Sequence, residues 1–282
     1  MPIHDEIGTR MKKYYEEIPK TRLMRRCPVI IRLDMRAGHS YTKGFKRPFD
    51  DIFIKSMQDT AKYLCQNVQG AVMSYQQSDE ISLLLIDYQT LNSQAFFDYE
   101  VQKVCSITAS MATLAFNEAF EKNVYNLMHK TTENNQDDSD EYKEALLKAM
   151  TKGAMFDSRC FNLVKEECAN YFYWRQLDAT RNSIQMVGQA NFSHKELQGK
   201  SCNAIQDMLH EQRGINWNDL PTYQKRGSCC IKIEELADGA IKELGDGSGV
   251  YNEGDVIRRR WVIDNDIPIF TGDCRQYIER FI

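Results

Sequence analysis

Residues 28–164 alternate short apolar runs with longer amphipathic stretches, and this order limits the folds open to the chain. "PVIIRLD" (28–34) is a β-branched run of strand length, and "RPFDDIFIKSMQDTAKYLCQNV" (47–68) has apolar residues at helical spacing. Two short apolar runs follow in a hairpin pattern, then a second long helix over 99–120 and a strand over 154–164. The order strand, helix, strand, strand, helix, strand predicts an α+β fold with the ferredoxin-like βαββαβ arrangement.

The predicted hairpin carries acids between two buried runs. "GAVMSY" (70–75) and "ISLLLI" (81–86) are separated by five residues that include Asp79 and Glu80. In a ferredoxin-like sheet the first and third strands are central neighbours, so Asp34, at the end of the first strand, is expected near this hairpin. Three carboxylates at one edge raise one another's pKa unless a cation binds them. The pattern predicts either a solvated hairpin or a site for two Mg²⁺ ions, which prefer carboxylate and phosphate oxygens and support phosphoryl transfer.

Composition excludes some other classes of protein. The charge sums to −4, so no overall basic field indicates nucleic acid, although residues 1–60 carry 13 Lys/Arg against 8 Asp/Glu. That local excess is either a phosphate-facing surface or a solvated helix face. The nine cysteines lack the spacing of a zinc site, which indicates free thiols in a reducing compartment. The N-terminus is polar, and no apolar run approaches the roughly 18 residues of a membrane span, so we expect a soluble, cytoplasmic protein without a membrane partner.

The remaining segments predict a two-part organisation. An amphipathic helix is expected over 4–18, helices over 166–188 and 194–212 with a capping box at Ser193–Glu196, and short strands within 228–282. The acidic stretch 131–144 predicts an exposed loop or insertion. The Gly-rich turn "ELGDGSGVYNEGD" lacks the Gly-Lys-Ser/Thr ending of a phosphate-binding loop. We therefore expect a catalytic domain over 1–164 with an insertion near 131–144, and a mainly helical region over 165–282 with a strand-like tail.

Four blocks of sequence together resemble the tRNA-His guanylyltransferase family. They are "PVIIRLDMRAGHSYTKGF", "SYQQSDEISLLL", "AMFDSRCF" and "YFYWRQLDATRNSI", and the matched blocks lie between about residues 8 and 232. The resemblance is greatest to the bacterial and archaeal "like" branch, whose members add nucleotides in the 3′-to-5′ direction. It implies a polymerase-type palm for the first domain, GTP, ATP and other nucleoside triphosphates as substrates, a tRNA partner, and a homotetramer.

The resemblance also assigns roles to particular residues. It implies that the metals are held by Asp34, Asp79 and the backbone carbonyl of Met35, with Glu80 as the catalytic acidic neighbour. The implied nucleotide-binding residues are Asp34, Met35, Arg36, Ala37, Gly38, His39, Arg47, Ser78, Asp79 and Lys103. Lys43 and Lys46, beside Arg47, also fit a triphosphate. The candidate RNA contacts are Trp174, Arg175, His194, Lys195 and Lys200. For the aromatic run "YFYW" (171–174), packing in the core is the alternative, and for His194 the alternative is an exposed position just inside a helix cap.

Two departures from the family pattern bear on function. Met35 replaces the Gly of Asp-Gly-Arg, which leaves a carbonyl ligand intact. Enzymes that add the extra guanosine to tRNA-His carry a His where this chain has Thr180, and most of the surrounding motif is absent. The departure favours template-dependent repair of tRNA 5′ ends. The alternatives are a dedicated tRNA-His guanylyltransferase, a nucleotidyl cyclase-like enzyme and a non-catalytic tRNA binder.

Overall fold

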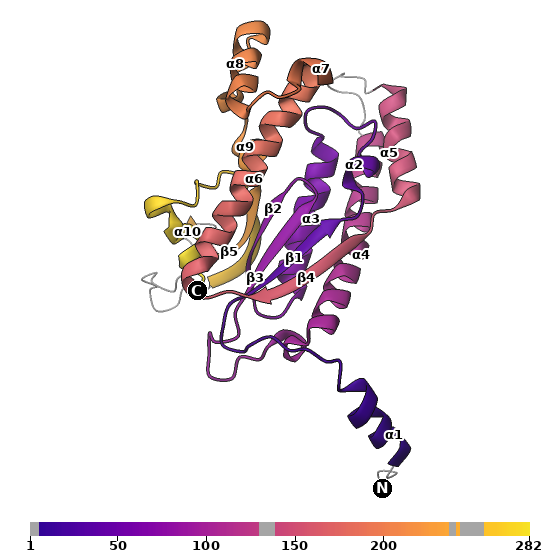
Figure 1. Cartoon of the computed structure of the whole chain (residues 1–282), viewed down its shortest axis with the longest axis vertical. Helices are drawn as coiled ribbons and strands as arrows, with labels where there is room; N and C mark the ends of the chain where they lie inside the picture. Colours follow the sequence, from indigo (N-terminus) through magenta and orange to yellow (C-terminus); the bar gives the residue numbers. More distant parts are fainter. Residues whose placement is uncertain (1–5, 130–138, 237–240, 243–256) are drawn as a thin grey trace.

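The computed structural model describes residues 6–129, 139–236, 241–242 and 257–282, and its centre is one antiparallel sheet (Figure 1). The strand order is β4-β1-β3-β2-β5-β6, and β7 also pairs with β5. The strands are β1 (Val29–Met35), β2 (Ala71–Gln77), β3 (Glu80–Leu85), β4 (Phe156–Asn162), β5 (Ser228–Leu236), β6 (Ile241–Lys242) and β7 (Ile257–Asp264). Strands from the second half of the chain therefore extend the sheet that the first half begins.

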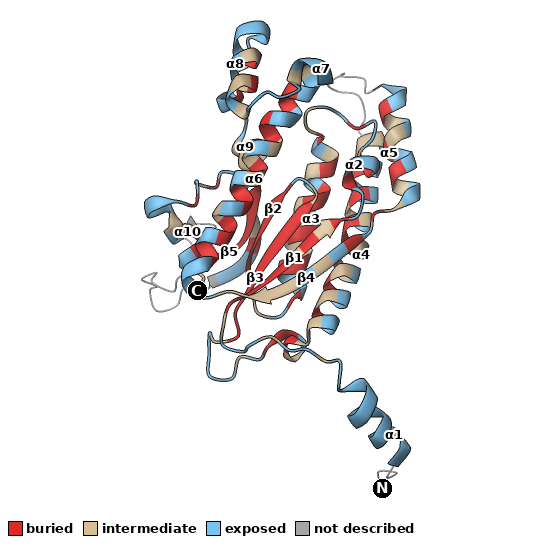
Figure 2. Ribbon diagram, viewed as in Figure 1, coloured by how far each residue is buried: buried red, intermediate tan, exposed pale blue. Residues whose placement is uncertain are grey.

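Helices cover both faces of this sheet, so its central strands are buried (Figure 2). α3 (Asp51–Asn67) and α4 (Val101–His129) pack on one face, where Ile31, Leu33 and Leu83 join a large apolar core. α6 (Lys165–Asn191) lies on the other face over a second core. The alternation of side chains along a strand explains this division, because successive residues of β1 point to opposite faces. Asp34 therefore shares the α6 face with Arg32.

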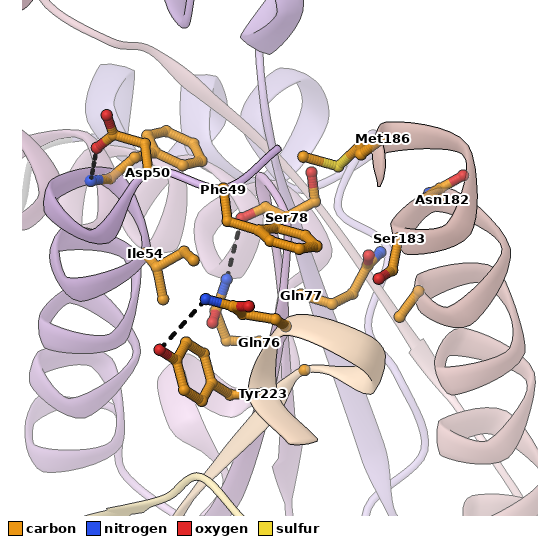
Figure 3. A pocket seen from close by; sticks show the side chains of 14 residues that line it. Phe49, Asp50, Ile54, Gln76, Gln77, Ser78, Asn182, Ser183, Met186 and Tyr223 are labelled. Atoms are coloured by element: carbon orange, nitrogen blue, oxygen red, sulfur yellow. Dashed lines mark hydrogen bonds between the residues drawn. The ribbon is translucent and has the colours of Figure 1, made fainter. Parts of the chain in front are cut away.

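The hairpin between β2 and β3 is tighter than the sequence predicted. Five residues were expected between the strands, but only Ser78 and Asp79 separate β2 from β3. The antiparallel pairing of β2 with β3 continues through Gln76 and Gln77. Both glutamines are buried although their side chains, shown with Ser78 in Figure 3, are polar. Ser78 takes a φ of 49°, which allows the sharp reversal. The short turn fixes Asp79 directly beside the end of β1.

Part of the acidic stretch 131–144 is helical. Residues 130–138 lie outside the described structure, but 140–144 begin α5 (Asp140–Lys152), which the sequence analysis missed. The hydroxyl of Ser139 accepts a hydrogen bond from the backbone N–H of Tyr142, and two acids occupy the first turn of the helix. Both features stabilise a helix start, so the acids are capping residues here.

The second half of the chain follows the predicted pattern with one break. The capping box at Ser193 and Glu196 is present, but the helix expected over 194–212 is divided into α7 (His194–Leu197) and α8 (Cys202–Arg213). The Gly-rich turn falls within 243–256, outside the described residues. The remaining short elements are α1 (Glu6–Met11), η1 (Lys12–Glu16), α2 (Gly38–Tyr41), η2 (Phe96–Tyr99), η3 (Trp217–Asp219), α9 (Thr222–Arg226), η4 (Gly272–Arg275) and α10 (Gln276–Glu279). Among the helices of the described residues, none is both long and apolar enough to cross a membrane.

Candidate active site

Two acids meet where β1 ends and the β2–β3 hairpin turns. Asp34 is aligned with Glu80 across β1 and β3, and the backbone N–H of Met35 donates to the carbonyl oxygen of Asp79 at 3.0 Å. Burial raises the pKa of the Asp79 carboxyl, and the nearby Asp34 raises it further. Burial also raises the pKa of the Asp34 carboxyl. Asp34 and Asp79 are 45 positions apart in the chain, and the prediction that they lie together is confirmed.

A further acid, Asp157, stands opposite Asp34 on the other side of β1 and also raises the pKa of Asp34. Asp157 is exposed and is paired with Arg159 at 2.9 Å. By contrast, neither Asp34 nor Asp79 has a salt bridge within the described part of the chain. The sequence analysis missed Asp157, although the alternation in "FDSRCF" places Asp157 and Arg159 on one face of β4.

The donor set of the two acids fits Mg²⁺. Neither carboxylate forms a salt bridge among the described residues, although the nearby Arg32 partly offsets the rise that burial causes in the pKa of Asp34. Besides burial, repulsion from Asp34 raises the pKa of Asp79, and this repulsion is relieved when a cation binds between them. No group of three or more Asp, Glu, His or Cys side chains in the described structure is arranged to hold a metal. Mg²⁺ commonly binds through only one or two carboxylates and completes its shell with water and substrate phosphates.

The segment after β1 leaves space for Asp79. Ala37 takes a left-handed conformation with a φ of 56°, and it turns the chain into α2. Gly38, the first residue of α2, passes directly beside Asp79, and a Cβ placed on Gly38 would overlap the Asp79 carboxylate. Glycine is therefore required here for a close approach and not for its backbone angle.

We expect Gly38→Ala to reduce nucleotide transfer by about 10²-fold while the protein remains folded. The added methyl group displaces the Asp79 carboxylate, and misplacing a catalytic group by about 1 Å can cost this much. Steady-state kinetics and circular dichroism together measure the effect. Gly214→Ala is the control, because it lies at the end of α8 outside the groove and nothing lies within 4 Å of a Cβ there. Its φ of 67° strains an alanine, so this variant should lose some stability but keep its activity. Unchanged activity in Gly38→Ala would contradict the role given to Asp79.

A groove leads from the acids to the second half of the chain. One pocket of about 420 Å³ contains Gly38, Ser78 and Asp79, and an adjoining pocket of about 410 Å³ shares Ser78 with it. A third pocket of about 520 Å³ shares Gln189 and Arg47 with the second. The basic side chains along the groove are His39, Lys43, Lys46, Arg47, His194 and Lys200. These basic side chains make the groove suited to binding phosphate groups, which are negatively charged.

The buried Asp50 holds in place the loop before α3 that carries Lys43, Lys46 and Arg47, here called the basic loop. Its carboxylate accepts hydrogen bonds from the backbone N–H groups of Lys46 at 3.1 Å and Phe53 at 2.9 Å, and from the hydroxyl of Tyr142 at 2.8 Å. Asp50 thereby caps α3 and joins the loop to α5. The side chains of Lys43 and Arg47 remain exposed at the groove.

Glu80 and Arg175 have a different environment from the one expected. Arg175 is buried, with 4% of the residue exposed, and its guanidinium donates to both Glu80 oxygens, from Nε at 2.7 Å and Nη2 at 2.9 Å. Arg32 also contacts Glu80 at 2.6 Å. Arg175 is thus buried and paired, which corrects its assignment as an RNA contact. Glu80 is held by two arginines and lines none of the groove's pockets, a geometry suited to positioning the neighbouring Asp79 and not to contacting a substrate.

Lys103 lies far from the site, which corrects its assignment to the nucleotide. α4 runs along β4 so that Cys105 contacts Cys160 and Thr108 contacts Ser158. Lys103, one turn before Thr108, is therefore level with the beginning of β1, whereas Asp34 is at its end. It packs over the ring of Phe97.

The other RNA candidates are exposed at two places. His194 and Lys200 line the far end of the groove, and the neighbouring Lys195 is exposed on α7. Core packing holds for Tyr171 and Phe172, which are buried, but not for Trp174, which is 52% exposed. The guanidinium groups of Arg32 and Arg175 lie near its ring, at 5.9 Å and 4.4 Å from the centroid.

Comparison with known proteins identifies similar chains. Residues 8–164 match the family described as tRNA(His) guanylyltransferase. The structure resembles that of a bacterial tRNA(His) guanylyltransferase-like protein in complex with ATP, with 40% identity, a TM-score of 0.76, and coverage of 98% of both chains. A second structure with the same description, in complex with GTP, has 39% identity and a TM-score of 0.71, and the match covers 98% of this chain and 99% of that one.

More distant relatives match over most of the chain. The tRNA(His) guanylyltransferase of Saccharomyces cerevisiae is 24% identical over 234 residues, covering 76% of this chain and 86% of the yeast protein. An uncharacterised mimivirus protein is 26% identical over 236 residues, which is 80% of this chain and 76% of its own length.

Proposed function

The chain belongs to the tRNA(His) guanylyltransferase family of nucleotidyltransferases, and we propose that it adds nucleotides to the 5′ end of tRNA in the 3′-to-5′ direction on a template strand. One observation carries the proposal. Asp34 and Asp79 lie together without a salt bridge in the described chain, and Asp79 lines one end of a groove that carries basic residues. We further infer that β1 to β4 with α3 and α4 form a ferredoxin-like, polymerase-type palm, because the four strands lie in the order β4-β1-β3-β2.

We assign the metal site to Asp34, Asp79 and the carbonyl of Met35, with two Mg²⁺ ions in the active enzyme. Bound Mg²⁺ lowers the pKa of an attacking hydroxyl and stabilises the charge of the leaving group. Asp34 and Asp79 supply the negative charge for those ions, and the tight hairpin holds Asp79 in register with β1. Ser78, at the tip of the hairpin, and the basic loop before α3 are placed to bind the triphosphate.

The proposed reaction has two stages. ATP first transfers AMP to the 5′-monophosphate of the RNA and releases pyrophosphate. The 3′-hydroxyl of the incoming nucleotide then attacks the activated 5′-phosphate, and AMP leaves. Lys43, Lys46 and Arg47 offset the charge of the phosphates in the groove. Base pairing with the template supplies the choice of incoming nucleotide.

The proposed branch of the family follows from the residues around Thr180. Thr180 lies on α6, in the segment where dedicated tRNA-His enzymes carry their His-containing motif. Thr180 in place of that His supports an enzyme that reads the template strand and does not recognise one particular tRNA. tRNA-His guanylyl addition is the second candidate, and the similarity to the yeast enzyme favours it.

The function is tested with a tRNA transcript lacking its first 5′ nucleotide, incubated with Mg²⁺, ATP and each labelled triphosphate in turn. We expect one-nucleotide extension only with the triphosphate that is complementary to the opposing base. Addition of guanosine only to full-length tRNA-His, whatever base stands opposite, would favour the second candidate. Consumption of triphosphate without RNA would indicate a cyclase-like enzyme, and no consumption at all a non-catalytic binder.

Mg²⁺ is expected to stabilise the wild-type protein against heat but not Asp79→Asn. At about 100 times its dissociation constant, a ligand that binds only the native state adds about 2.7 kcal/mol. Burial raises the pKa of Asp79, so without metal its ionised form opposes folding, and that cost grows as the pH rises through the raised pKa. Asp79→Asn should therefore have a higher melting temperature than the wild type in EDTA at pH 8. Equal responses of both proteins to Mg²⁺ would contradict the site.

Trp174→Ala is expected to weaken tRNA binding about fivefold or more and to leave triphosphate binding unchanged. An exposed indole flanked by two arginines can stack on an unpaired base, which contributes about 1–3 kcal/mol per base. Filter binding of a truncated tRNA measures the effect. Tyr125→Ala, at an equally exposed ring on α4, is the control and should bind tRNA as the wild type does.

We also propose that copies of the chain associate, as a homotetramer in the cytoplasm. Supporting this, α1 and η1 contain no buried residue, and the side chains of Ile7, Tyr15 and Ile18 are exposed. Helical segments of this kind gain stability by packing against another molecule. Analytical ultracentrifugation measures the mass, and a monomer at micromolar concentration would refute the assignment.

A further inference from the structure

Two cysteines face each other between the edge strand of the sheet and the helix that covers it. The Sγ atoms of Cys105 on α4 and Cys160 on β4 lie 3.6 Å apart, although the two residues are 55 positions apart in the chain. Both are free thiols, and both are partly exposed. The candidate active site uses neither, because Cys160 is aligned with Ile31 in the middle of β1, whereas Asp34 lies near the end of that strand.

The surrounding contacts hold the two thiols opposite each other. Ser158 and Cys160 lie on the same face of β4, and both meet α4. The hydroxyls of Thr108 and Ser158 are hydrogen-bonded at 2.8 Å. Further along α4, the backbone N–H of Phe156 donates to the hydroxyl of Thr113 at 3.1 Å. This row of contacts runs along the length of β4, where α4 lies beside it (Figure 1), so the facing of the two thiols is fixed by the fold.

A short movement would join the two sulfur atoms. In a disulfide they are about 2.05 Å apart, so closure from the observed contact requires a shift of about 1.5 Å. Side-chain rotation and a small displacement of β4 supply this shift. β4 is the edge strand and is paired only with β1 within the described residues, and all of it except Phe156 is at least partly exposed. The edge strand therefore has more freedom to move than the central strands.

A second pair of thiols, Cys65 and Cys230, lies in the core and is protected from oxidation. Both residues are buried. Burial raises the pKa of Cys65 well above its usual value, and the contact with Cys230 raises it further. Because the thiolate is the form that reacts with oxidants, a buried and protonated thiol stays reduced. The partly exposed pair on α4 and β4 is the one that an oxidant can reach.

We propose that Cys105 and Cys160 are a peroxide-sensitive dithiol that forms a reversible disulfide between α4 and β4. One thiolate attacks an oxygen of hydrogen peroxide, the O–O bond breaks, and a sulfenic acid forms while the displaced hydroxide takes up the thiol proton as water. The other thiol then attacks the sulfenic sulfur, so the S–S bond forms, the S–O bond breaks and a second water leaves. Two thiols and one peroxide thus give one disulfide and two waters.

The surroundings of the thiols set the order of the two steps. Burial raises the pKa of Cys160 to about 12, and the neighbouring Cys105 raises it further. Cys160 is therefore protonated at neutral pH, and the reaction with peroxide falls to Cys105. The second step is intramolecular, because Cys160 is already in contact with the sulfur that it attacks. This proximity offsets its small fraction of thiolate.

The disulfide would tie the edge strand to the helix behind it. β4 carries Asp157 and Arg159 beside Asp34, so the link would restrain local opening next to the acids. It also closes a long loop of the chain, and we expect the melting temperature to rise by about 5–10 °C. None of these steps involves a nucleotide or RNA, so the dithiol is independent of the proposed function.

The test treats the reduced wild-type protein with stepwise equivalents of hydrogen peroxide, blocks the remaining thiols with iodoacetamide and digests the protein with trypsin. Cleavage after lysine and arginine places Cys105 in the peptide 104–122 and Cys160 in the peptide 160–165. We expect mass spectrometry to find these two peptides joined, with the loss of two hydrogens. Dithiothreitol should separate them and return the melting temperature to its starting value.

Three variants show whether the pair acts as proposed. Cys105→Ser and Cys160→Ser should each lose both the joined peptides and the gain in melting temperature. Cys160→Ser should also accumulate a sulfenic acid on Cys105, which dimedone traps. Cys274→Ser is the matched control, because that thiol is exposed on η4, and it should form the disulfide as the wild type does.

The wild-type digest alone can overturn the proposal, even if a variant fails to fold. Sulfinic acid on Cys105 without joined peptides, a disulfide between other cysteines, or a disulfide between two copies of the chain would each contradict it. A joined pair with an unchanged melting temperature would refute the restraint of the edge strand. Because nucleotide addition is not measured, failure of 5′ extension would count against the proposed function alone.

Discussion

Asp79→Asn and Asp34→Asn are each expected to reduce nucleotide addition by about 10³-fold or more. The two carboxylates lie together without a salt bridge in the described chain, Asp79 lines the groove, and partial burial raises the pKa of both. Losing several kcal/mol of charge stabilisation in the transition state corresponds to a reduction of this size. Single-turnover extension of a truncated tRNA measures the rate directly, without a contribution from product release.

The controls separate chemistry from folding. Asparagine has nearly the same shape and removes a buried charge, so neither variant should lose stability. tRNA binding should also be retained, because the RNA candidates lie elsewhere on α6 and α7. Asp157→Asn is the matched control, because Asp157 is aligned with Asp34 but is exposed and paired with Arg159. We expect it to lose less than tenfold. Full activity in Asp34→Asn or Asp79→Asn would show that the metal assignment is wrong.

The convergence of these acids could be predicted from the sequence, because it depends on the order of the elements. Antiparallel pairing of the first and third strands brings Asp34 to the hairpin whatever the exact register. The length of the hairpin could not be predicted in the same way. Gln76, Gln77 and Glu80 are polar and indicate a loop, whereas the burial of Glu80 and Gln76 depends on Arg175 and Ser228, which are more than 90 positions distant.

Lys103 and Arg175 show the limits of assigning a role by residue type. A lysine near the start of a long helix indicates a phosphate contact only if that end of the helix faces the site. The direction of α4 along β4 decides this, and it places Lys103 at the far end. An arginine beside an exposed tryptophan likewise suggests RNA, but helical geometry turns Trp174 outward and Arg175 toward the sheet. Only the packed structure distinguishes the two neighbours.

Arg175→Met is expected to destabilise the protein by about 3–5 kcal/mol. The substitution leaves the Glu80 carboxylate buried with fewer hydrogen bonds, and an incompletely paired buried charge is costly. Urea unfolding followed by circular dichroism measures the loss. Arg181→Met is the matched control, because Arg181 pairs with Asp178 from the same helix but is exposed. An exposed pair contributes about 0–1 kcal/mol, so that variant should remain close to the wild type.

The double variant Arg175→Met/Glu80→Gln tests whether the ion pair acts as a unit. Removing both charges eliminates the unpaired group, so the double variant should be more stable than Arg175→Met alone. The activity of the double variant reports on the position of Asp79, because Glu80 begins β3 directly after Asp79 and the pair holds the hairpin against α6. If the pair positions Asp79, the double variant will need more Mg²⁺ for half-maximal activity even where it is fully folded. A double variant that regains stability and keeps the wild-type Mg²⁺ requirement would limit the pair to a structural role.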